Sequence, residues 1–356
     1  MSRAGQLDCV CGPLAGDTAR NGSDAWRLAI GFGLAVLAQA LTLAALPIAG
    51  AALAPQPALA SLPYALTLLG AAIASLPASM LLDQFGRRAA FALGACLGTS
   101  GGILAAFAIA TRQFGLLSLG ALWIGIAQGF ALFYRHAAAS AQAGGTRAAL
   151  TTLAGGCAAS VLAPGVIAMA QRTYGPLADY SLMLAIGLVS FAALPFLLTL
   201  PNGLAGEARA PNVPVAKFWQ ASAVAAIAWF IMARAMAGAP VALAGCGLGT
   251  AAIAGFVSWH LLAMYGPFAL ASRYALPAAP VIAAGGALLA LSTLLPRSAP
   301  PQIETALLAA GIGWSLVQTG ATRLLHDDGP RSRLELAAHD TLILGAALAG
   351  AMSISA

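Results

Sequence analysis

The sequence predicts an all-α protein that crosses a membrane many times. Of its 356 residues, 60% are hydrophobic and only 8% are charged, and the mean hydropathy is +0.86. A soluble domain of this length needs far more polar surface than this composition supplies. The apolar residues also gather into runs of about 17–25, the length that an α-helix needs to cross a bilayer. Since backbone groups in lipid must be satisfied within the segment, the spans are expected to be helices.

Hydropathy and helix-breaking residues divide the chain into two sets of expected membrane spans. The first set has six members, which cover residues 26–52, 58–81, 89–110, 114–134, 148–171 and 179–200. The second set has five members, which cover residues 218–243, 250–266, 275–295, 304–324 and 338–355. Each span ends where polar, Gly or Pro residues interrupt the apolar run. We therefore expect about 11 transmembrane helices.

Two polar segments complete the expected organisation. Residues 1–25 contain three Asp and do not resemble a cleaved signal peptide, so we expect a cytoplasmic tail. Residues 201–217 form the longest polar break inside the apolar region and predict a cytoplasmic linker. The linker separates a six-helix bundle at 26–200 from a five-helix bundle at 218–356.

The basic residues predict an orientation. With the N-terminus inside, thirteen Lys and Arg residues fall in expected cytoplasmic segments, and three fall outside, at Arg112, Arg172 and Arg297. This bias places the N-terminus in the cytoplasm and the C-terminus in the periplasm of a bacterial inner membrane. The net charge of +6 is dispersed over short loops, so nucleic-acid binding is not expected. Arg234 remains inside an expected span, without a partner that the sequence identifies.

One loop between two expected spans carries a family motif. Residues 79–88 read SMLLDQFGRR, in which a small or apolar run precedes Asp83, Gly86, Arg87 and Arg88. Gly permits a tight turn, and the charged side chains can bond to neighbouring helix ends. The loop resembles the signature loop of the major facilitator superfamily. That resemblance implies a two-bundle transporter whose family pattern has twelve helices, with these four residues controlling the change of conformation. The alternative is a solvated basic loop.

The second bundle opens with two spans that carry soft metal ligands at helical spacing. Met232 and Met236 are four residues apart, and so are His260 and Met264, so each pair lies on one face of its helix. Counted from a turn midway between the spans, Met236 and His260 form one rung and Met232 and Met264 form the next. Thioether and imidazole groups without a carboxylate favour Cu(I) over Mg²⁺, Ca²⁺ or Mn²⁺. The alternative is that these residues only fill gaps in the packing, as Met often does.

Further segments resemble the CcoA-like copper transporters, a bacterial branch of the superfamily. They are residues 133–139, 153–156, 163–165, 259–260, 264–267, 313–314, 322–325 and 339–340. In that branch the two ligand pairs are the proposed copper sites, so the resemblance implies a copper importer that binds the ion as its substrate and needs no cofactor. It also implies the lipid bilayer, a cytoplasmic copper chaperone and cytochrome oxidase assembly factors as partners. Two features depart from the branch: eleven expected helices instead of twelve, and His136 where an aromatic residue is expected.

Two rival functions stay open. A related branch is thought to move riboflavin, and an organic-solute carrier would depend on Trp229, Trp259 or Trp314 instead of the Met residues. A copper-binding assembly factor would bind the ion without transporting it. An enzyme is not expected, because the sequence contains no P-loop or H-E-x-x-H pattern.

The sequence says little about energy coupling. Asp340, next to His339 at the expected start of a helix, is the only plausible proton relay, and a helix-capping role explains it equally well. Facilitated movement down a gradient is the simpler hypothesis. Cys9 and Cys11 in the tail could exchange Cu(I), and Cys246 could capture an entering ion or merely fill space.

Overall fold

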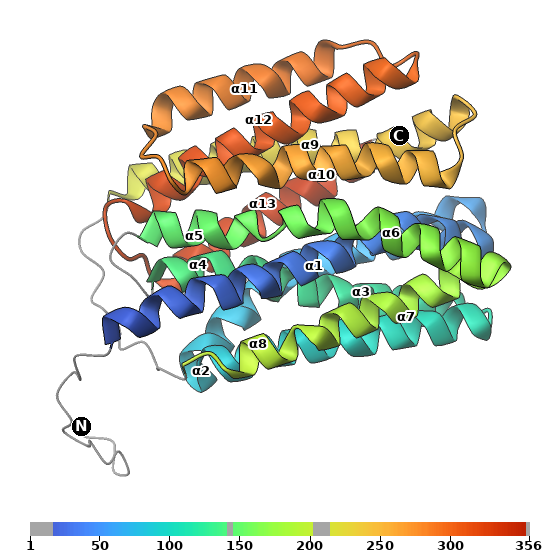
Figure 1. Ribbon diagram of the computed structural model, residues 1–356, viewed down its shortest axis with the longest axis horizontal. Coiled ribbons are helices and arrows are strands. Elements are labelled where there is room, and N and C mark those ends of the chain that lie inside the picture. The colour runs from blue at the N-terminus through green and yellow to red at the C-terminus, as the bar shows by residue number, and fades with distance from the viewer. Residues whose placement is uncertain (1–16, 141–144, 202–213, 354–356) are drawn as a thin grey trace.

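The computed structural model describes residues 17–140, 145–201 and 214–353, and the regular structure within them is helical (Figure 1). The N-terminal half contains α1 (Asp17–Leu53), α2 (Leu62–Ala110), α3 (Phe114–Leu132), α4 (Tyr134–Ser140), α5 (Gly145–Ala154), α6 (Cys157–Tyr174), α7 (Ala178–Ala192) and α8 (Leu194–Leu198), with 3-10 turns at Pro57–Leu59 and Gly175–Leu177. The C-terminal half contains α9 (Val215–Gly245), α10 (Thr250–Ala271), α11 (Ala278–Leu294), α12 (Pro300–His326) and α13 (Arg333–Met352).

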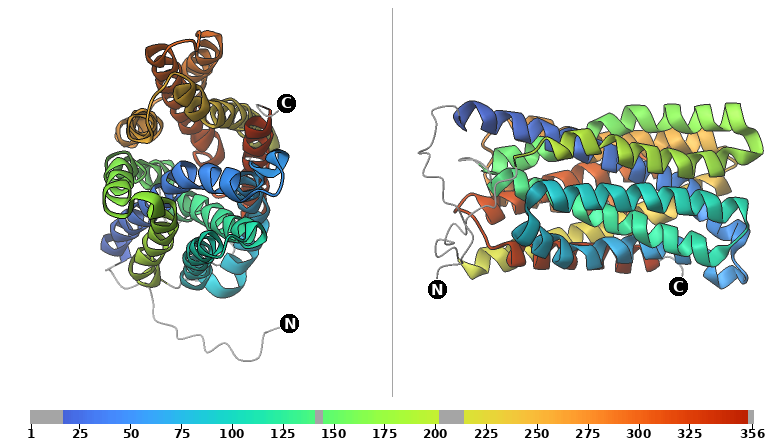
Figure 2. Two further views of the ribbon diagram at one scale, coloured as in Figure 1. Left: turned by 90° about the vertical axis from the view of Figure 1, so that its right-hand side faces the viewer. Right: turned by 90° about the horizontal axis from the view of Figure 1, so that it is seen from below.

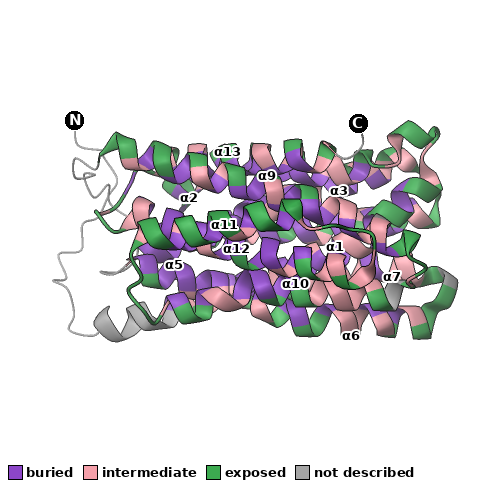
Figure 3. Ribbon diagram, turned by 90° about the horizontal axis from the view of Figure 1, so that it is seen from above, coloured by how far each residue is buried: buried purple, intermediate pink, exposed green. Residues whose placement is uncertain are grey.

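The long helices run along one common axis, as a multi-pass membrane protein requires (Figure 1). Within the described residues, 8 helices are long and apolar enough to cross a membrane. Viewed along the axis, α11 and α12 stand apart from the compact group formed by the N-terminal half (Figure 2). Buried residues line the interior of the bundle, and exposed ones face outward along the helices (Figure 3). The outward residues include large apolar side chains such as Val161, Leu188 and Leu294, which suit contact with lipid.

The helix α2 is two expected spans joined at Gly86. This residue has φ 80° and ψ 176°, a conformation that Gly adopts without a Cβ clash. Both arms of α2 pack against α3, since Gly125 lies against Thr67 of the first arm and Gly120 against Gly101 of the second. Further along α3, Gly129 lies against Ala71 of the first arm and Phe130 lies against Gly94 of the second, so the two arms run in opposite directions. The signature loop is therefore a tight reversal.

Helix α1 starts before the first expected membrane span. Helix α1 begins at Asp17, whereas hydropathy placed the start near residue 26. Hydropathy detects where a helix enters lipid and does not detect polar helical turns outside it. Residues 1–16 and most of the expected linker, 202–213, lie outside the described residues.

The backbone approach of α2 and α3 gives a testable expectation. A Cβ at Gly125 would overlap the carbonyl oxygen of Thr67, so Gly125→Ala should lower the free energy of unfolding by about 1–3 kcal/mol. Gly115→Ala in the same helix is the matched control, because a Cβ there meets nothing within 4 Å. The melting temperatures of the purified proteins measure the effect. Equal values for the two variants would contradict the close packing.

Candidate functional site between the two halves

A small cavity lies where the two halves meet, and three of the four expected metal ligands line it. Its volume is about 40 Å³. The side chains of Met232 and Met236 from α9 and of Met264 from α10 reach it, and all three are buried. The other lining residues come from both halves: Gln39, Ala40, Leu43, Tyr64, Leu68, Trp229, Ala233, Leu261, Tyr265 and Ala347. A site shared by both halves is where a rocking carrier holds its substrate.

The fourth expected ligand, His260, is not among the residues that line this cavity. Its side chain is fully buried, and its ring Nδ1 lies 2.7 Å from the carbonyl oxygen of Leu307 on α12. The physical reason lies in the packing: α10 packs against α12, α6 and α5 and touches α9 little. The face of α10 that meets the cavity is therefore that of Leu261, Met264 and Tyr265. The pairing of Met236 with His260 as one rung of a metal site stays a prediction.

Aromatic rings pack beside the cavity. Trp314 of α12 lies 5.2 Å from Trp229, 5.8 Å from Tyr265 and 5.8 Å from Phe268, measured between ring centroids. Phe32 of α1 lies 5.8 Å from Tyr265 and joins the cluster from the N-terminal half. All five rings are buried and pair edge to face, which is a favourable arrangement. We call these five residues the aromatic cluster.

The expected fifth span is interrupted beside the aromatic cluster. It consists of α5 and α6, which are separated at Gly155 and Gly156. A Cβ at Gly156 would overlap the ring of Tyr265, and a Cβ at Gly155 would overlap the backbone of Ala29 on α1. The two Gly residues therefore make room for the ring and for α1. Interrupted helices at membrane depth occur where a transporter contacts its substrate.

A buried polar network joins the halves at one end of the bundle. Asp340 of α13 is fully buried, and its Oδ1 accepts a hydrogen bond from Arg135 Nη2 of α4 at 2.6 Å. His136 Nε2 lies 3.1 Å from the same oxygen, and His136 Nδ1 lies 3.1 Å from His326 Nε2 of α12. Gln318 Oε1 lies 3.5 Å from Arg135 Nη1. Two halves that share a buried ion pair are held together at this point.

The same end carries further contacts between the halves. Arg333 Nη1 lies 2.5 Å from Asp83 Oδ1, and Thr146 Oγ1 donates to Asp327 Oδ1 at 2.5 Å. We call this end, with the Arg135–Asp340 pair, the closed end; in Figure 1 it is the side where α4 ends and α5 begins. By the expected orientation it faces the cytoplasm.

The other residues of the signature loop hold the N-terminal half together. Arg88 donates through Nε and Nη2 to the carbonyl oxygen of Leu200, at 3.2 and 3.0 Å, just beyond the end of α8. The side chain of Arg87 is buried. These bonds place the loop against the end of the expected sixth span.

Sequence reasoning did not find the network as a unit. Asp340 was weighed as a helix cap, but α13 begins at Arg333 and is capped by Ser332, whose side chain and that of Glu335 form a capping box. Asp340 thus lies two turns inside the helix. The one sequence feature that pointed to the network was His136, which departs from the family pattern.

Comparison with known proteins agrees with this architecture. No family model matches the chain. Over 296 residues the chain is 30% identical to the riboflavin transporter RfnT of Brucella anthropi, a major facilitator protein, with 78% of this chain and 74% of that protein covered. The chain belongs to the major facilitator superfamily.

Solved transporter structures share the fold. The proton:xylose symporter XylE superposes with a TM-score of 0.69 at 14% identity, over 95% of this chain and 89% of that one. A bacterial homologue of the iron transporter ferroportin, in an outward-facing state, gives 0.67 at 15% identity, over 93% and 92%. The two-bundle membrane fold predicted from sequence is confirmed. The narrower resemblance to the copper branch remains a prediction.

Proposed function

We propose that the protein carries a planar aromatic solute of the flavin class across the bacterial inner membrane, with riboflavin as the named candidate. The similarity to a riboflavin transporter supports this proposal. The observation that carries it is the aromatic cluster beside the cavity between the halves. A flavin presents a flat tricyclic ring, and such rings stack against Trp and Tyr side chains.

Unsatisfied donors near the cavity also favour a polar aromatic solute. The indole N–H groups of Trp229 and Trp314 are buried and have no hydrogen-bond acceptor among the described residues. Buried donors normally have partners. The ring carbonyl oxygens of a flavin are suitable acceptors. Gln39 and Tyr64 offer further polar groups from the N-terminal half.

The cavity must widen to hold such a solute. Its volume is about 40 Å³, whereas most small-molecule sites have a volume of about 300–1,000 Å³. The structure therefore suits an occluded state that is shut at the closed end. Rocking of the halves would enlarge the site and expose it to one side at a time.

Uptake by whole cells tests the solute. Bacteria that cannot make riboflavin should accumulate radiolabelled riboflavin and grow at low external concentration when they express this chain, and not with an empty vector. Radioactive copper uptake in the same cells is the second arm. Copper accumulation without riboflavin accumulation would overturn the flavin proposal.

Copper is the second candidate, because three thioethers line one cavity. A carrier for Cu(I) would use Met232, Met236 and Met264 without His260. Met232→Leu combined with Met236→Leu separates the candidates, since Leu nearly conserves the volume of Met. We expect riboflavin uptake to stay within about twofold of wild type, whereas a copper carrier would lose copper uptake.

A further inference from the structure

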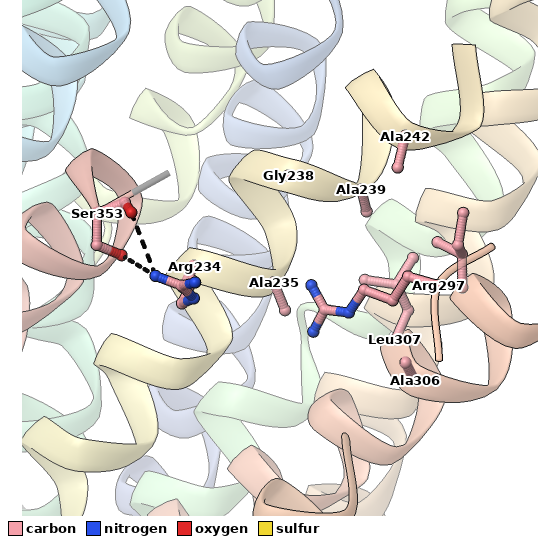
Figure 4. Close-up of a pocket in the computed structure, with 10 residues that line it drawn as sticks. Arg234, Ala235, Gly238, Ala239, Ala242, Arg297, Ala306, Leu307 and Ser353 are labelled. Atoms are coloured by element: carbon pink, nitrogen blue, oxygen red, sulfur yellow. Dashed lines mark hydrogen bonds between the residues drawn. The ribbon is translucent and has the colours of Figure 1, made fainter. Parts of the chain in front are cut away.

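A second cavity lies away from the site between the halves, inside the C-terminal half. Its volume is about 370 Å³, within the range of about 300–1,000 Å³ typical of ligand sites. Small residues of α9, among them Ala235, Gly238 and Ala239, form one wall, and Ile303, Ala306 and Leu307 of α12 form the other (Figure 4). The small side chains of α9 leave the space open.

Two guanidinium groups extend into this cavity from different elements (Figure 4). Arg234 belongs to α9, and Arg297 belongs to the segment between α11 and α12. Arg234 Nη1 donates to the Oγ and the carbonyl oxygen of Ser353, at 2.8 and 3.2 Å. Arg297 Nη2 lies 3.4 Å from the carbonyl oxygen of Ser292. These acceptors are neutral, so two positive charges share one space.

No acidic residue lines the cavity among the described residues. Glu304, the acidic residue nearest to it along α12, is not one of the lining residues. A cation inside an apolar span is costly unless an anion or water compensates it, and Arg234 lies within the span Val215–Gly245. Each guanidinium has five N–H donors. The bonds to Ser353 and Ser292 use only Nη1 of Arg234 and Nη2 of Arg297, so most of the donors on both residues can bind a ligand.

We propose that this cavity binds a phosphate-bearing anion between Arg234 and Arg297. The planar fork of Arg matches the oxygens of a phosphate, and two forks can hold one group from two sides. Basic pockets between transmembrane helices recognise lipid headgroups by the same chemistry. Arg234 is eleven residues before the last residue of α9, about 16 Å from that end at 1.5 Å per residue. An anion therefore reaches the site from that end of the bundle or from the surrounding lipid. The site does not depend on which solute is carried.

Binding to the purified full-length protein tests the site. Native mass spectrometry measures retention of phosphatidylglycerol, with phosphatidylcholine as the neutral-headgroup comparison, and thermal melting measures stabilisation by inorganic phosphate. Arg234→Gln and Arg297→Gln should each weaken binding about tenfold or more, because each removes a charge-assisted pair. Arg172→Gln is the control, since Arg172 is an exposed arginine at the end of α6.

The two arms distinguish the sources of the phosphate. Retention of phosphatidylglycerol that both cavity variants lose, without an effect of inorganic phosphate, identifies a lipid headgroup. Stabilisation by inorganic phosphate that both variants lose identifies a soluble anion. Equal behaviour of wild type and the cavity variants in both arms, or the same loss in Arg172→Gln, overturns the proposal. Should Arg234→Gln fail to fold, Arg297→Gln decides, because Arg297 lies outside the helices.

Discussion

Asp340→Asn is expected to abolish net solute uptake and to open the closed end. The change leaves Arg135 almost fully buried with only neutral partners. Removing one partner of a buried ion pair costs about 3–5 kcal/mol. That cost destabilises the conformation in which the pair is formed. The equilibrium constant between the closed and the open form should therefore shift at least about a hundredfold toward the open form. A carrier held open on one side cannot complete its cycle.

Spin labels can measure the opening. Ser140 of α4 and Leu334 of α13 are exposed and lie on opposite halves near the closed end. In a background without native cysteines, labels at Ser140→Cys and Leu334→Cys should move apart in the Asp340→Asn variant. Arg135→Gln combined with Asp340→Asn removes both charges and should restore part of the short distance. Unchanged distances and uptake in Asp340→Asn would show that the ion pair does not hold the halves together.

The fold could be predicted from the sequence because its cause is local. Apolar runs of membrane length and the charge bias of the loops depend on neighbouring residues only. The break at Gly86 could also be predicted, because the signature motif and the tight reversal that it forms lie within a few residues of each other in the sequence. The start of α1 at Asp17 could not be placed, because a polar helical turn outside lipid leaves no hydropathy signal.

The site could be predicted only where it depends on a single helix. Met232 and Met236 line one cavity because a spacing of four fixes one face. His260 does not line it, because its ring lies against the carbonyl oxygen of Leu307 on α12. Counting along the hairpin assumed that α9 and α10 are neighbours, whereas α10 packs against α12, α6 and α5. The Arg135–Asp340 pair joins residues 205 positions apart. The spacing of residues within one helix cannot predict a contact between two helices so far apart in the sequence.

Trp314→Leu is expected to reduce riboflavin uptake by at least tenfold. Trp314 contributes three of the ring pairs of the aromatic cluster, to Trp229, Tyr265 and Phe268. Each aromatic pair contributes about 0.5–1.5 kcal/mol beyond burial. Losing three pairs therefore disturbs the wall of the cavity, and a loss of this size corresponds to a decrease of more than about tenfold in the affinity for the solute. Trp314→Phe retains a ring and should keep more of the uptake than Leu does.

Trp259→Leu is the matched control. Trp259 is 59% exposed on α10 and belongs to none of the ring pairs, although the sequence alone offered it beside Trp229 and Trp314. Its replacement should leave uptake within about twofold of wild type, as for a surface substitution. Initial rates of riboflavin uptake, normalised to the amount of protein in the membrane, measure both variants. Equal loss in Trp259→Leu and Trp314→Leu would mean that the buried rings do not select the solute, and the flavin site would then have to lie elsewhere in the bundle.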